Sequence, residues 1–123
     1  MPVERAADHP TFENAGNTIT SLVAPARGSE DVALFRADIP PGGGIPRHRH
    51  DRFDVFVLLV GGVTFHLGDD TIKLVAGDSA VVPTGVRHGL EAGPEGASIL
   101  VAMLPNTMMI RDDDSEVIPD WVR

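Results

Sequence analysis

The chain has 123 residues, a formal net charge of −8 and no cysteine. This length fits one domain with one hydrophobic core, and the lack of cysteine excludes disulfides, zinc ribbons and iron–sulfur clusters. The acidic charge argues against nucleic acid as a partner, because phosphates are bound by basic surfaces. The chain opens without a charged and then apolar leader, and its longest apolar run, Val55 to Val60, is far too short for a bilayer span. We therefore expect a cytoplasmic protein with no membrane partner.

Thirteen glycines and ten prolines divide the chain into short segments rich in β-branched, aromatic and leucine side chains. Turn-like sequences such as PPGGGIP, GG, AGD and AGPEG separate these segments. No segment keeps a helical period over three turns, so we expect little helix. The pattern predicts an all-β sandwich or barrel of two Greek keys, with strands at residues 18–23, 31–39, 53–60, 63–67, 71–75, 79–82, 86–91 and 97–104.

These strands predict a single domain over residues 1–123, with its barrel at residues 18–104. Residues 1–17 are expected to form an N-terminal arm, and residues 105–123 a C-terminal tail that packs on the barrel. The charge run at residues 111–116 of this tail is expected to be solvated.

Two of the five histidines, His48 and His50, are separated by a single residue just before an apolar segment. Alternate side chains of a strand share a face, so these two imidazoles point the same way, and Asp54 has the same parity. Arg47 and Arg49 have the opposite parity and are expected outside. If the shared face is the interior, the buried imidazoles need partners for their donors and acceptors, and a divalent ion satisfies both rings.

A His-x-His pattern alone is short and also occurs as a surface or core feature. Here a third histidine, His88, follows in the segment GDSAVVPTGVRH. The first segment reads Gly42, five residues, His-x-His, three residues, Asp, six residues, Gly. The second reads Gly77, five residues, Pro-x-Gly, two residues, His. Over residues 42–92 these spacings resemble the paired motifs of the cupin superfamily.

The resemblance implies a double-stranded β-helix, the jelly-roll barrel of small cupins, holding one metal ion through His48, His50 and His88. A carboxylate is an optional fourth ligand in this family. Many single-domain cupins pair through their N-terminal strands, so the resemblance also implies a homodimer.

Two positions depart from the cupin motifs. Ala92 stands where the second motif has Asn, a position that is usually structural. Asp54 stands where the first motif has Glu, and its side chain is shorter by about 1.5 Å. Either the chain moves inward so that Asp54 coordinates the metal, or Asp54 accepts a hydrogen bond that orients a histidine. We expect coordination, with a role as general base as the alternative.

Further residues are candidates for a substrate pocket. Arg52 could bind a substrate carboxylate at the barrel mouth, or pair with a neighbouring acid. Phe56, Leu58 and Met103 could line an apolar cavity, or belong to an ordinary core. His66 lies inside if the Gly-Gly turn before it preserves the register, and otherwise on the surface.

Three imidazoles, with or without a carboxylate, suit Fe(II), Mn(II), Ni(II), Cu(II) or Zn(II), and the ligand types do not separate these ions. Open coordination positions let such an ion bind a substrate through oxygen or activate dioxygen. The first hypothesis is therefore a metalloenzyme for an oxygenated small molecule, with dioxygenase chemistry ahead of isomerase, lyase or decarboxylase chemistry. The second is a non-catalytic module that binds a sugar or another metabolite, because a fold does not fix a function. The third is a structural metal in an interaction protein.

Overall fold

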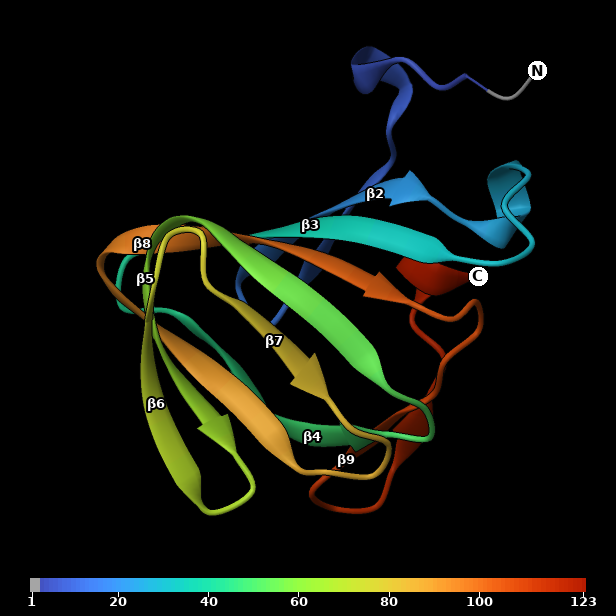
Figure 1. Cartoon of the computed structure of the whole chain (residues 1–123). Coiled ribbons are helices and arrows are strands. Elements are labelled where there is room, and N and C mark those ends of the chain that lie inside the picture. The colour runs from blue at the N-terminus through green and yellow to red at the C-terminus, as the bar shows by residue number, and fades with distance from the viewer. Residues whose placement is uncertain (1–2) are drawn as a thin grey trace.

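The computed structural model describes residues 3–123, whose strands form a single β-sheet that curls into a barrel-like shape (Figure 1). The prediction of an all-β jelly roll with little helix is confirmed. Within residues 3–123 the helical structure consists of three short 3₁₀ turns, η1 (Ala6–Asp8), η2 (Pro25–Arg27) and η3 (Asp120–Val122). The strands are β1 (Thr11–Asn14), β2 (Asn17–Val23), β3 (Ala33–Ile39), β4 (Gly44–His50), β5 (Asp54–Leu67), β6 (Asp70–Val75), β7 (Ser79–Val82), β8 (His88–Met103), β9 (Met109–Arg111) and β10 (Glu116–Val117).

Two long strands, β5 and β8, hold the barrel together. They pair antiparallel along almost their whole length, from Asp54 opposite Met103 to Leu67 opposite His88. The first half of β8 also pairs with β4, and its second half pairs with β3. The other edge of β5 carries β6 and β7. Each end of β8 therefore belongs to a different part of the curled sheet, and the interior lies between them (Figure 1).

The sequence signals misplaced several strand boundaries. Gly61–Gly62 and residues 92–96, both expected as turns, lie inside the continuous strands β5 and β8. The strands bend at these points, where their register shifts twice between Leu58 and Val63. Gly61 has a φ of +83°, and a Cβ there would overlap the carbonyl oxygen of Gly96. Here glycine allows two backbones to approach closely within the sheet, which is a common role of strand glycines.

Strands also occur in both terminal segments. β1 in the expected N-terminal arm forms a hairpin with β2, and β9 in the expected tail pairs with β4 along its last three residues. β4 itself was missing from the expected strands, because its first residues resemble a turn sequence. In the described part of the chain, no helix is long and apolar enough to cross a membrane.

The core follows from alternation along the strands, whose inward side chains are apolar and buried. In β3, for example, Ala33, Phe35, Ala37 and Ile39 point inward. Phe56 and Phe65 meet edge to face with ring centroids 5.1 Å apart. The tail closes one side of this core, where Trp121 packs against Phe12 and Phe35.

Candidate metal centre

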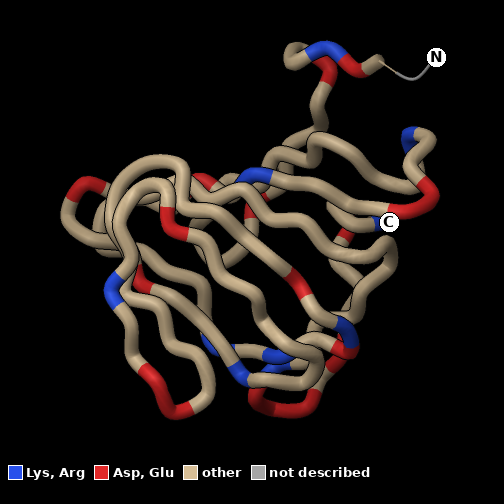
Figure 2. Tube along the Cα trace, viewed as in Figure 1, with Lys and Arg blue, Asp and Glu red and all other residues tan. Residues whose placement is uncertain are grey.

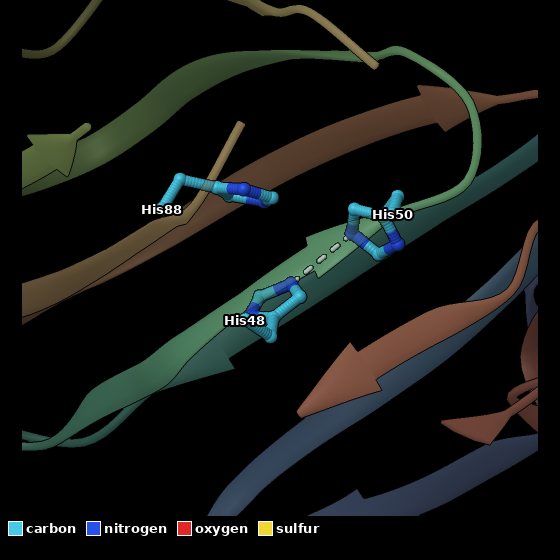
Figure 3. A group of neighbouring side chains, drawn as sticks. All are labelled: His48, His50 and His88. Carbon is cyan, nitrogen blue, oxygen red and sulfur yellow. Dashed lines mark hydrogen bonds between the residues drawn. The ribbon is translucent and has the colours of Figure 1, made fainter. Parts of the chain in front are cut away.

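Three buried histidines face one another inside the barrel (Figure 3). His48 and His50 are two residues apart on β4 and therefore share its inner face. His88 begins β8 and lies directly opposite His48 in the β4–β8 pairing. The ring centroids are 4.4 to 5.2 Å apart. The sheet register therefore brings the two histidine segments, 38 positions apart in sequence, to one point.

Backbone carbonyls orient two of the rings. Nδ1 of His48 lies 2.8 Å from the Pro46 oxygen, and Nδ1 of His88 lies 2.9 Å from the Val86 oxygen. Since a carbonyl oxygen only accepts, each of these Nδ1 atoms carries the proton, and each Nε2 keeps its lone pair. This arrangement is common for histidines that bind metals through Nε2. The Nε2 of His48 accepts a hydrogen bond from Nε2 of His50 (Figure 3).

The separations between the rings fit a shared metal ion. The Nε2 atoms of His48 and His50 are 3.1 Å apart. Two nitrogens bound at about 2.0–2.1 Å to one ion lie roughly 3 Å apart, so this pair has the spacing of neighbouring ligands. Ligand atoms of all three histidines lie within 4.8 Å of one another. Neutral imidazole donors of this kind suit a divalent transition metal.

Asp54 begins β5 and lies beside this group without being part of it. Its Oδ1 is 4.0 Å from Nε2 of His88 and, among the described residues, finds no hydrogen-bond partner. Burial raises the pKa of the Asp54 carboxyl to about 7. The structure thus places the predicted carboxylate next to the histidines, with an unpaired oxygen inside the barrel.

Burial also keeps the imidazoles neutral. It lowers the pKa of His48, that of His50 to about 3, and that of His88 to about 4. Repulsion between the rings adds to the effect for His50 and His88. The folded protein therefore presents three neutral imidazoles at neutral pH, which is the charge state that metal binding requires.

These shifts predict how the stability of the metal-free protein depends on pH. Below about pH 6.5 the unfolded chain binds protons on these imidazoles that the folded chain does not, so the free energy of unfolding falls on acidification, by up to about 1.4 kcal/mol per pH unit for each proton. Asp54 contributes to the pH dependence of the free energy of unfolding with the opposite sign. Between its ordinary pKa of 3.8 and about 7 the folded state holds its proton and the unfolded state does not, so acidification through this range stabilises the fold. Urea unfolding of chelator-treated protein between pH 5 and 7 should show a steeper loss for Asp54→Asn than for the wild type. Equal slopes would contradict this assignment of protons.

The three histidines, Asp54, Asn14 and Asn17 form the polar part of a largely apolar cavity. The space open to the centre of a water molecule is about 70 Å³. Most of the remaining wall consists of aliphatic and aromatic side chains from the inner faces of both halves of the barrel: Ile19, Phe35, Ala37, Ile45, Phe56, Phe65, Leu90, Ile99, Val101, Met103, Met109, Pro119 and Trp121.

Two of the five expected pocket residues, Phe56 and Met103, line this cavity, and three do not. Arg52 is exposed in the bend between β4 and β5, and Leu58 is fully buried in the core behind the cavity wall. His66 lies on the outer face of β5, where its Nε2 is 3.4 Å from Glu91. The register shifts in β5 explain this position. Before the shifts the side chains that point inward have even residue numbers, and after the shifts they have odd residue numbers.

Several residues of the cavity gave no signal in the sequence. Met109 and Trp121 come from the tail, where they were expected only to pack on the barrel. Asn17 precedes the first expected strand and resembles a turn residue. It lines the cavity all the same and is almost completely buried.

The tail is held over the histidine end of β4 by ion pairs. Arg87 binds both carboxylate oxygens of Asp112 at 2.6 and 2.8 Å, and Arg49 binds Asp114 at 3.0 Å. Figure 2 shows this acidic loop beside the basic positions of the barrel. The charge run thus has partners, although all of these groups are at least partly exposed and each such pair adds little stability.

The fold and the site together define a small jelly-roll barrel with a histidine triad in its interior. A sequence model of the family described as Cupin domain matches residues 35–103. The chain therefore belongs to the cupin domain family, and the resemblance in its motifs is confirmed.

Part of the chain is similar in sequence to a protein with a known name. The oxalate-binding protein of Thermotoga maritima is 30% identical over 57 residues, which are 46% of this chain and 47% of that protein. The chain thus matches about half the length of this relative.

Solved structures share the fold. The polyketide cyclase RemF of Streptomyces resistomycificus is 23% identical with a TM-score of 0.73, over 87% of this chain and 83% of that one. Oxalate decarboxylase of Bacillus subtilis is 20% identical with a TM-score of 0.72, over 80% of this chain and 28% of that one.

Proposed function

We propose that this cupin is a metal-dependent enzyme that acts on an oxygenated small molecule, with dioxygenase chemistry as its leading reaction. One observation carries the proposal: three neutral imidazoles and one unpaired carboxylate meet in the wall of a buried, largely apolar cavity. The candidate ions are Fe, Mn, Ni, Cu and Zn. A redox-active divalent ion held there would bind a substrate oxygen and activate dioxygen.

The protein side chains have distinct roles in this proposal. His48, His50 and His88 hold the ion, and the carbonyl oxygens of Pro46 and Val86 fix the orientation of two of these rings. Asp54 is either a further ligand or the general base that takes a proton from the substrate, since it is the one acidic side chain that lines the described cavity. The apolar wall excludes water from the reacting groups.

Oxygen uptake tests this function and the role of Asp54 together. We expect metal-loaded protein to consume dioxygen with a diketone, flavonol or thiol substrate, and we expect Asp54→Asn to lower the rate by about 100-fold or more if its carboxylate moves a proton. Metal content measured on the same samples separates the two roles, because loss of a ligand also lowers metal retention. Full metal content and no oxygen uptake with any substrate would contradict dioxygenase chemistry, and an unchanged rate in Asp54→Asn would remove this residue from the mechanism.

A non-catalytic module that binds a small molecule is the second candidate. The name of the oxalate-binding relative from Thermotoga maritima favours it. In this case the protein would bind a metabolite at the metal and release it unchanged.

The proposal also includes the homodimer and the cytoplasmic location that were expected from the sequence.

A further inference from the structure

Asn17, at the start of β2, has an amide oxygen with no hydrogen-bond partner among the described residues. Only 1% of this residue is exposed, and it belongs to the wall of the cavity that holds the histidines. A buried amide oxygen without a partner costs about 1–3 kcal/mol, so such groups are rare unless a ligand or a water completes them.

The orientation of this amide is fixed by its neighbour. Nδ2 of Asn17 donates a hydrogen bond of 3.0 Å to the carbonyl oxygen of Gly44. A flipped amide would place two oxygens against each other, because a carbonyl oxygen only accepts. The Gly44 contact therefore keeps the nitrogen occupied and leaves Oδ1 as a free acceptor.

Asn17 and the histidines lie at different places along the cavity. Asn17 contacts β4 at Gly44, whereas the ligand histidines start at His48 on the same strand. β4 has a bulge between Ile45 and His48, and the facing residues of β8, Glu91 to His88, span three strand positions, about 10 Å. A molecule that touches both the metal and Asn17 is therefore elongated.

The wall between these two points suits an uncharged ring system. Phe35, Phe56, Phe65 and Trp121 contribute aromatic surface, and no Lys or Arg lines the cavity in the described part of the chain. A small dianion would have to rely on the metal alone for charge neutralisation. An aromatic body gains contact area and edge-to-face packing along this wall.

We propose that Asn17 is a specificity-determining residue that accepts a hydrogen bond from a hydroxyl group of the substrate. The substrate class is then an elongated aromatic molecule that binds the metal through oxygen at one end and carries the hydroxyl at the other. This inference rests on the proposed function of the histidine site, and it names the chemistry of the substrate.

The test compares three naphthoates as probes: 6-hydroxy-2-naphthoate, 6-methoxy-2-naphthoate and 2-naphthoate. Each has a carboxylate for the metal, and only the first has a hydroxyl donor at the far end. We expect titration calorimetry on metal-loaded wild type to give about tenfold or more tighter binding for the hydroxyl compound than for the other two. In Asn17→Leu, whose side chain is similar in size and apolar, the three affinities should agree within about threefold.

Thr18→Val is the matched control, because Thr18 is the next residue and its hydroxyl binds Glu13 outside the cavity. This variant should keep the preference of the wild type. A structural role of Asn17 would weaken all three probes equally and leave their ratio unchanged, and that result would overturn the inference. Equal binding of the three probes by the wild type, or binding of none of them, would also overturn it.

Two further measurements keep the test decisive. If Asn17→Leu does not fold, the side-chain amide resonance of Asn17 in the wild type should shift on addition of the hydroxyl compound and not of the methoxy compound. Elemental analysis of each sample separates this inference from the proposed function. Metal retention without a hydroxyl preference overturns the inference alone, whereas a wild type that retains no metal overturns both.

Discussion

Replacing His48 or His88 with alanine should lower the affinity for a metal ion at least about 100-fold. Each substitution removes one of three imidazole donors, and loss of a direct ligand costs more than the 10–100-fold typical of a residue that only orients a ligand. The barrel itself should remain, because its core consists of apolar side chains distinct from the histidines. Elemental analysis after purification without chelator, together with far-ultraviolet circular dichroism, measures both effects.

His66→Ala is the matched control for these variants. His66 lies on the outer face of β5 beside Glu91, outside the cavity. It should retain the metal content of the wild type. Full metal retention in both His48→Ala and His88→Ala would show that the ion is held elsewhere.

Replacing Gly61 with alanine should lower the free energy of unfolding by about 2–5 kcal/mol. The left-handed backbone at φ +83° costs an alanine about 1–2 kcal/mol, and overlap with a neighbouring group adds about 1–3 kcal/mol. The overlapping group is the carbonyl oxygen of Gly96, which belongs to β8 and cannot rotate away. The bend of β5 against β8 therefore depends on this glycine.

Gly16→Ala separates the two contributions. Gly16 also has a φ of +83°, but a Cβ there would have nothing within 4 Å. Its loss of stability should stay near 1–2 kcal/mol in urea unfolding. Similar losses for Gly16→Ala and Gly61→Ala would mean that the close approach of the two strands contributes nothing.

The histidine cluster could be predicted from the sequence because much of its geometry is local. His48 and His50 share a face by strand alternation alone, and the spacing of the second motif brings His88 to the facing strand. The turn residues predicted an all-β sandwich or barrel, and the resemblance of the motif spacings to those of cupins implied the jelly roll. Asp54 was predicted near this group, and its shorter side chain agrees with its position beside the histidines.

The strand boundaries and the remaining cavity residues depended on contacts that the spacing of residues in the sequence does not encode. The register shifts in β5 reverse which residues point inward. Alternation counted from Phe56 therefore predicted an inward His66, whereas its side chain lies on the outer face. Glycines at 61 and 62 give the same sequence signal whether a strand bends or ends. β9 pairs with β4 across a long stretch of chain, and Asn17 becomes a cavity residue only because the β1–β2 hairpin reaches Gly44.

Anomalous diffraction from crystals of metal-loaded protein, recorded at the absorption edge of the metal found by elemental analysis, tests the assignment of the site most directly. We predict one strong peak in the barrel interior at about 2.0–2.2 Å from Nε2 of His48, His50 and His88. A peak bound by other side chains, or metal-loaded protein with no peak between these three rings, would contradict the metal centre and the function proposed from it.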